Sequence, residues 1–410
     1  MHLREETVLS YEGVLEQSAA NLRQLLKDGE EVIGYIYPHT PLELILAHGL
    51  TPSLLRALPG VPGGFEESLQ TFACSYIRNL YSQRTNDQMP SLAGLIFPGN
   101  TCDSLQNLFD VWRFRFPDDT IFRLTYPVTR HEKDGSTVKY LTTELQLLSE
   151  AIEKSLDRPF VSQYFERAKS LIGQFRKDSQ YLYGARLLDP SVLSYTDLCR
   201  LARAFLTTPL PVIGSEIYAI TSSVKEKMKD MGFAGTVDSI LRALKTRDFS
   251  NIDNFEPIIR PRIIVTGGMV EPQAIANVIT GIRGITDSVL VLDLLSFGFK
   301  TAFTPPLVTK GTPFEQMAKS ILSSPGEPTQ EGLIHRVKYL ESLFDALQID
   351  GVMICEQSFC DPDQFEAPSI EKAASKHGIR TVRIPIDPEL SDRARMEVRI
   401  QSFLESLSKS

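Results

Sequence analysis

The sequence lacks the features that mark several common protein classes. Its 410 residues contain only five cysteines, no C-x-x-C pair and no apolar run long enough to span a membrane. Few, widely spaced thiols exclude a disulfide framework and the compact zinc or ferredoxin spacings. The G-x-x-x-x-G-K-[ST] loop for nucleoside triphosphates and the G-x-G-x-x-G spacing for dinucleotides are also missing. A P-loop nucleotide site is therefore not expected.

The balance of charge argues against a nucleic-acid partner. The chain has a formal net charge of −8, and its basic residues form no stripe that would neutralise a phosphate backbone. The first residues, MHLREE, are polar rather than the start of an apolar signal segment. These observations predict a soluble cytoplasmic protein that binds neither nucleic acid nor membrane.

Alternating strand and helix patterns are present in two parts of the chain. Residues 31–37 have the pattern of a short buried strand, and a helix follows at 42–47. The same unit recurs with a strand at 92–97 and a helix at 103–113, after an earlier helix that begins near Cys74. Repeated strand, loop and helix units are typical of a parallel sheet covered by helices.

A second set of strands follows a long helical stretch. Amphipathic helix patterns predominate from about 140 to 250, and further strands are predicted at 261–268, 288–293, 350–355 and 380–385. We therefore predict an α/β fold with two Rossmann-like parallel-sheet domains and a helical middle region. The predicted boundaries are 1–140 for the first α/β domain, 141–255 for the helical region and 256–410 for the second α/β domain.

Four of the five cysteines lie at or near places where ligands gather in such folds. Cys102 and Cys360 follow predicted strands, Cys355 stands at the end of one, and Cys74 lies at a loop-to-helix transition. A helix N-terminus favours the thiolate, which is the form that binds metal. Cys199 falls within an amphipathic helix, where core packing is expected. Spacing alone leaves both a metal site and ordinary buried thiols open.

Several short segments together resemble one known family. They are residues 34–50, 74–78 (CSYIR), 100–104 (NTCDS), 262–268, 359–362 (FCDP) and 399–405. Their order over most of the chain is similar to that of the 2-hydroxyacyl-CoA dehydratase family, which includes benzoyl-CoA reductase subunits. The resemblance implies that Cys74, Cys102 and Cys360 bind an oxygen-sensitive [4Fe–4S] cluster. Cys355 could supply a fourth ligand, or it could be a buried thiol of the sheet.

The resemblance also implies a reaction and partners. Such enzymes remove water from a 2-hydroxyacyl-CoA after injection of one electron, because the resulting ketyl radical anion expels hydroxide. The electron comes from a separate ATP-dependent iron–sulfur activator, and the catalytic chains work as pairs of homologous subunits. His39 and Thr40 occupy a loop where relatives place polar residues near the acyl-CoA, so we predict both as catalytic-site residues.

Three other functions remain open at this point. A benzoyl-CoA reductase-type subunit would use the same one-electron radical chemistry to reduce an aromatic ring. The run NTCDSLQN also suits the benzoyl-CoA reductase members of the family. A non-catalytic iron–sulfur electron-transfer protein would keep the cluster but handle no thioester. An α/β binding protein whose cysteines bind zinc or nothing is the third alternative.

Overall fold

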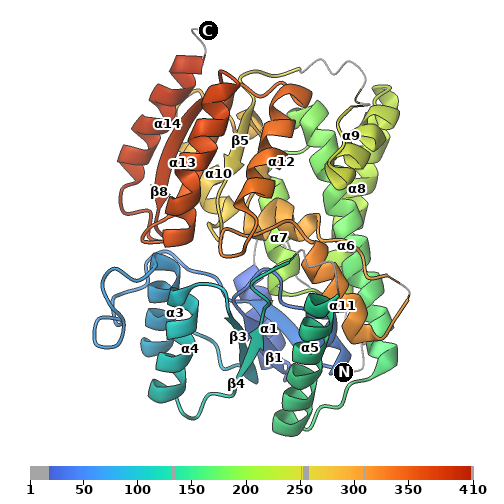
Figure 1. Cartoon of the computed structure of the whole chain (residues 1–410), viewed down its shortest axis with the longest axis vertical. Helices are drawn as coiled ribbons and strands as arrows, with labels where there is room; N and C mark the ends of the chain where they lie inside the picture. The colour runs from blue at the N-terminus through green and yellow to red at the C-terminus, as the bar shows by residue number, and fades with distance from the viewer. Residues whose placement is uncertain (1–17, 131–134, 251, 253–257, 309, 408–410) are drawn as a thin grey trace.

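The protein is built on two parallel four-stranded sheets, one in each half of the chain (Figure 1). The computed structural model describes residues 18–130, 135–250, 252, 258–308 and 310–407. The strand orders are β2-β1-β3-β4 and β6-β5-β7-β8. In each sheet the first strand in the sequence, β1 or β5, is an inner strand. The second strand pairs with it on one side, and the third and fourth strands lie on its other side. This confirms the predicted α/β class with two Rossmann-like sheets.

The first sheet forms the lower half of the molecule in Figure 1. Its inner strands are buried on both faces, as expected for parallel strands covered by helices. The edge strands β2 and β4 were not predicted: β2 is four residues long and contains Pro52, while the side chains of β4 alternate in burial. The elements are α1(Ser18–Lys27), β1(Val32–Tyr35), α2(Leu42–Ala47), β2(Thr51–Leu54), α3(Ser75–Thr85), β3(Gly94–Gly99), α4(Asp103–Arg115) and β4(Ile121–Thr125).

Long helices connect the two halves. They are α5(Ser136–Leu156), α6(Ser162–Leu188), α7(Tyr195–Thr207), α8(Pro211–Asp230) and α9(Ala234–Thr246), with a short turn at Pro190–Val192. Helix α6 contacts α2 of the first half and β6 of the second, and it runs along the right side of Figure 1. From α6, Tyr183 donates a 2.6 Å hydrogen bond to Asp293 in β6. These helices hold the two sheets in one fixed arrangement.

The second sheet lies in the upper half of Figure 1. Its elements are β5(Ile263–Thr266), α10(Pro272–Gly281), a turn at Asp287–Val289, β6(Leu290–Leu294), a kinked turn at Ser296–Lys300, α11(Pro313–Ser323), α12(Leu333–Ala346), β7(Gly351–Gln357), α13(Asp361–Lys376), β8(Arg380–Ile386) and α14(Arg393–Leu407). Helix α13 begins directly after Cys360, with Asp361 and Pro362 in its first turn.

Some sequence predictions fall partly outside the described residues. The polar first residues, MHLREE, lie before the described part of the chain, which begins at Ser18. The predicted boundary between 255 and 256 also lies in a segment that is not described. In the part of the chain that the structure covers, no helix is long and apolar enough to cross a bilayer.

Candidate cysteine site and cationic cavity

Three cysteines from distant parts of the sequence line one cavity between the two sheets. Cys74, Cys102 and Cys360 are the residues directly before α3, α4 and α13, and each occupies the N-cap position. The cavity has a volume of about 460 Å³, and residues that follow β3, β5 and β7 contribute to it. The carboxyl ends of both sheets therefore meet at the place where the sequence predicted a thiolate site.

Direct hydrogen bonds between the two halves hold this cavity together. The backbone N–H of Ser75 donates to the carbonyl oxygen of Ser358 at 2.9 Å, and the Gln357 amide donates to the Ser75 hydroxyl at 2.5 Å. Ser75 directly follows Cys74, and Gln357 lies three residues before Cys360. These bonds fix the distance between two of the thiols.

The thiols differ in their readiness to ionise. A hydrogen bond from Cys360 lowers the pKa of the Cys74 thiol, although burial acts in the opposite direction. The same hydrogen bond and burial raise the pKa of Cys360. Burial raises the pKa of Cys102 to about 12. Cys74 is therefore the most readily ionised of the three thiols, and each of them must lose its proton to bind a metal.

The three thiols are chemically suitable ligands for an iron–sulfur cluster. Within the described ranges, no three His, Cys, Asp or Glu side chains stand at the spacing that one ion requires. A [4Fe–4S] cluster is held by cysteine thiolates, each bound to a different iron. Three thiols at helix N-termini around a cavity of this size suit such a cluster.

The other two cysteines lie elsewhere. Cys355 is fully buried inside β7 and lines a second cavity, not the one shared by the three N-cap cysteines. Burial raises its thiol pKa above the ordinary value. Cys199 is buried in α7. This placement gives no support to Cys355 as a fourth ligand, and it agrees with core packing for Cys199.

The second cavity opens beside the first and is rich in cations. It has a volume of about 410 Å³ and lies at the carboxyl ends of β5, β6 and β7. Lys177, Lys245 and Arg247 line it, and in the described residues none of the three has a carboxylate partner within ion-pair distance. Cations without carboxylate partners at a cavity wall suit the phosphate groups of a ligand.

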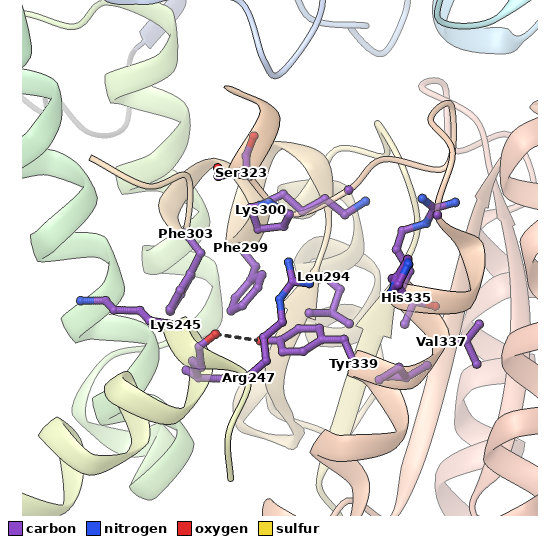
Figure 2. A pocket seen from close by; sticks show the side chains of 18 of the residues that line it. Lys245, Arg247, Leu294, Phe299, Lys300, Phe303, Ser323, His335, Val337 and Tyr339 are labelled. Carbon is purple, nitrogen blue, oxygen red and sulfur yellow. Dashed lines mark hydrogen bonds between the residues drawn. The ribbon is translucent and has the colours of Figure 1, made fainter. Parts of the chain in front are cut away.

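Aromatic side chains form another wall of this cationic cavity. Figure 2 shows Phe303, Phe299 and Tyr339 lying between Lys245 on one side and His335 on the other, with Arg247 against the Tyr339 ring. The rings of Phe299 and Phe303 stack with centroids 4.1 Å apart. The cavity therefore combines charge for phosphate with an apolar surface for an acyl chain or ring.

A segment that we call the strap, residues 324–333, separates the two cavities. Arg130, which follows β4, anchors its start by donating hydrogen bonds to the carbonyl oxygens of Ile321, Leu322 and Ser324. Its residues Glu331, Gly332 and Leu333 line both cavities, as do Arg336, Asp363 and Glu366. Only the residues that line both cavities lie between a ligand in the cationic cavity and the cysteine cavity.

A buried ion pair lies where the strap meets the second sheet. Lys300, which lines the cationic cavity, donates to Glu327 at 3.1 Å and to the Gly267 carbonyl at 3.2 Å. Glu327 lines the cysteine cavity and also accepts a 2.6 Å hydrogen bond from Ser296. Burial alone would raise the pKa of Glu327, but Lys300 and its other neighbours lower it. The carboxylate therefore stays charged.

His39 and Thr40 take different positions in the loop after β1. His39 is buried and faces Glu327, with its Nε2 atom 3.6 Å from the carboxylate Oε1. Thr40 lines a small adjoining cavity and donates a 2.8 Å hydrogen bond to the Tyr37 carbonyl. Neither residue lines the two larger cavities. His39 reaches the site through Glu327, whereas Thr40 closes the turn.

Sequence reasoning missed the strap and the residues that it brings to the site. Glu327, Lys245 and Arg247 stand in segments without a recognisable motif, and one basic residue looks like another in a sequence. The Pro-Gly-Glu-Pro run at 325–328 was the one available signal of an irregular segment.

Two parallel sheets that bring three N-cap cysteines to a shared cavity define the class of this protein: a two-sheet α/β protein with three cysteine thiols in a cavity between its halves. The description "2-hydroxyglutaryl-CoA dehydratase, D-component" belongs to the family model that matches residues 38–407. The chain belongs to this family, as the resemblance indicated.

Full-length relatives are similar at low identity. The (R)-phenyllactyl-CoA dehydratase beta subunit of Clostridium sporogenes is 21% identical, over 94% of this chain and 94% of the relative. The beta subunit of lactoyl-CoA dehydratase from Anaerotignum propionicum is 21% identical, over 98% and 100%. A benzoyl-CoA reductase subunit of Thauera aromatica is 23% identical, over 89% and 88%.

Proposed function

We propose that this chain is the iron–sulfur subunit of a radical 2-hydroxyacyl-CoA dehydratase, which eliminates water from a 2-hydroxyacyl-CoA to give an enoyl-CoA after one-electron activation. One observation carries the proposal: Cys74, Cys102 and Cys360 line a single cavity, and a cavity with cationic and apolar walls lies directly beside it. Two relatives named as dehydratase beta subunits support the same assignment.

The three thiols would hold the cluster. When bound, a [4Fe–4S] cluster supplies one-electron chemistry and one iron without a cysteine ligand, which can polarise a thioester carbonyl. The helix N-termini stabilise the thiolates, and the bonds of Ser75 to Gln357 and Ser358 keep the two halves in register. The chain's own task is thus to assemble and shield the ligands.

The cationic cavity would bind the acyl-CoA. Lys177, Lys245 and Arg247 would pair with the phosphates, and the wall of Phe299 and Phe303 would cover apolar parts of the ligand. The thioester would then lie near Lys300, whose ammonium group faces developing negative charge on the carbonyl oxygen. The strap would keep bulk water away from this point.

Partners complete the proposed system. Relatives named as beta subunits imply a homologous second subunit. A separate ATP-dependent iron–sulfur activator would supply the electron, which accords with the absence of a phosphate-binding loop in this sequence. The expected compartment is the cytoplasm.

A benzoyl-CoA reductase-type subunit is the second candidate. The match to the Thauera aromatica protein and the aromatic wall of the cationic cavity favour it. Reduction of benzoyl-CoA by the activated complex, without dehydration of any 2-hydroxyacyl-CoA, would establish this alternative. A loaded cluster together with no binding of acyl-CoA would instead establish a non-catalytic electron-transfer protein.

The test is an oxygen-free preparation of the chain with its partner subunit. Iron, acid-labile sulfide and the EPR spectrum are measured for the wild type and for Cys74→Ala, Cys102→Ala and Cys360→Ala. We expect about four irons per chain in the wild type and loss of the cluster in each variant. Dehydration of 2-hydroxyacyl-CoA is then assayed with an ATP-driven activator.

Cys199→Ala and Cys355→Ala are matched controls, because both residues are buried thiols outside the cavity. They should retain the iron. A wild type without iron, or iron that none of the three cavity variants removes, would overturn the proposal.

A further inference from the structure

Two buried polar atoms face one another without a hydrogen bond between them. His39 Nε2 and Glu327 Oε1 are 3.6 Å apart, and their side chains are only 1% and 2% exposed. In the described part of the structure neither atom has a hydrogen-bond partner. Buried polar atoms are almost always paired, because leaving one unpaired costs about 1–3 kcal/mol. A pair of this kind calls for a functional reason.

The neighbouring hydrogen bonds determine which protons are present. The Ser324 hydroxyl donates to the Ile321 carbonyl, so the Ser324 oxygen is left to accept from His39 Nδ1 at 3.3 Å. On this network we assign the ring proton of neutral His39 to Nδ1, which leaves a lone pair on Nε2. Glu327 Oε1 carries lone pairs as well, since Ser296 and Lys300 both donate to Oε2. The gap between the two atoms can accept one proton.

The surroundings of His39 disfavour a proton on its Nε2 atom at neutral pH. Burial lowers the pKa of His39 to about 3; Glu327 alone raises it, and the nearby Arg130, Lys300 and Arg176 lower it further. The Tyr37 ring packs against the imidazole with centroids 5.6 Å apart. A proton placed here is therefore held weakly and is released readily.

The pair also stands at the junction of the site's cavities. Glu327 lines the cysteine cavity, its partner Lys300 lines the cationic cavity, and His39 lines the small adjoining one. His39 comes from the first half of the chain, and Glu327 comes from the strap. The gap therefore exists only when both halves and the strap are in place.

We propose that Glu327 and His39 form the proton relay of the reaction, an inference that rests on the proposed dehydratase function. The C–H bond on the carbon next to the hydroxyl-bearing carbon breaks, and its electron pair stays on the acyl chain. The proton binds Glu327 Oε1 and passes to His39 Nε2. It then returns by the same route to the hydroxide that left the substrate, giving water. Glu327 lines the cysteine cavity and would face the reacting end of the substrate there, and His39 is a positioning residue that holds the proton behind it.

The test uses the iron-loaded complex with its partner subunit and compares Glu327→Gln, His39→Gln and His48→Gln. His48 is a matched control, since it is also buried but both of its ring nitrogens are paired, with the Arg158 carbonyl and Ser149. We expect dehydration and exchange of the substrate C–H with D₂O to fall about 100-fold in the first two variants. Iron content and acyl-CoA affinity should stay at the wild-type level, and His48→Gln should keep its exchange.

A second measurement does not depend on turnover. Nitrogen-15 NMR of the wild-type histidines should show His39 with its proton on Nδ1 and an unpaired Nε2 at neutral pH. In Glu327→Gln the new amide can donate to Nε2, so that signal alone should shift. Wild-type exchange in Glu327→Gln, or a proton on Nε2 in the resting protein, would overturn the relay. Absence of iron and of turnover in the wild type would instead overturn the proposed function itself.

Discussion

The two halves of the molecule share one strand order but carry different parts of the site. Cys102 follows the end of β3 at Gly99 by three residues, and Cys360 follows the end of β7 at Gln357 by the same number. The strands β3 and β7 occupy the same place in their sheets. In each half the cysteine caps a helix that begins with aspartate. Two equivalent turns thus supply one thiol each.

The comparison also shows where the halves differ. The helix before β3 is capped by Cys74, whereas the helix before β7 is capped by Gly332. The first half therefore provides two thiols and the second only one. The second half instead provides the strap, Lys300 and most of the cationic cavity. Two sheets with the same strand order thus carry one asymmetric site, because their loops differ.

The largest expected effect comes from breaking a contact between the halves. Gln357→Leu removes the hydrogen bond to Ser75 and should lower the free energy of unfolding by about 2 kcal/mol. Because that bond fixes the spacing of Cys74 and Cys360, the variant should also lose iron. Both quantities are measured on the oxygen-free complex, by chemical denaturation and by iron analysis.

The control for this prediction lies within the first half. Gln83 is equally buried, and its amide donates at 2.8 Å to the Arg56 carbonyl and to Asn79. Gln83→Leu should cost a similar free energy but leave the iron in place. Equal iron loss in both variants would mean that general stability, not the register of the halves, governs cluster retention.

A second prediction concerns the histidine that meets the other half. The pKa of His39 is lowered to about 3, below the ordinary value of 6.5 that it regains on unfolding. Between these values the unfolded chain binds the extra proton, so stability falls as pH drops below about 6.5. From pH 7 to pH 5 this amounts to about 2 kcal/mol. His39→Gln should remove that part of the pH dependence, as measured by urea unfolding at both pH values.

His48 is the control for the pH dependence of His39. It contacts only residues of the first half of the chain through its ring nitrogens, and both of these nitrogens are paired. Its pKa is also lowered by burial, but the hydrogen bond to the Arg158 carbonyl opposes that shift. The pH dependence should therefore change less in His48→Gln than in His39→Gln. The opposite ranking would contradict the electrostatic account of His39.

The third prediction tests the cavity that the second half helps to form. Arg247→Ala and Lys245→Ala should each weaken binding of coenzyme A about tenfold, since each removes one charged contact worth about 1.4 kcal/mol. Titration calorimetry at low salt would measure it, and added salt should shrink the difference. Lys225→Ala is the control, because Lys225 on α8 lies over the Tyr181 ring and outside the cavity. Unchanged affinity in both cavity variants would place the phosphates elsewhere.

How much the sequence could predict depended on how local each feature is. Buried strands such as 31–37 and the cysteines at helix starts were readable, because apolar runs and breakers act within a few residues. The edge strands β2 and β4 were missed, since pairing with distant strands holds them in the sheet. The meeting of Glu327 with His39 depends on the strap and both halves at once. No local pattern encodes such a contact.

The smallest expected effect tests whether the two cysteine turns are equivalent. Each turn contains a residue with positive φ: Asn100 at 56° and Phe359 at 62°. Asparagine tolerates this region and valine does not, so Asn100→Val should lower the free energy of unfolding by about 1 kcal/mol, and Phe359→Val should lower it less because phenylalanine is already strained there. Thr101→Val is the control, because Thr101 carries a buried hydroxyl without a partner in the described residues and should tolerate the change. If valine cost nothing at Asn100 but about 1 kcal/mol at Phe359, only the turn at Phe359 would need a left-handed backbone. The two halves would then share their strand order but not the conformation of their cysteine turns.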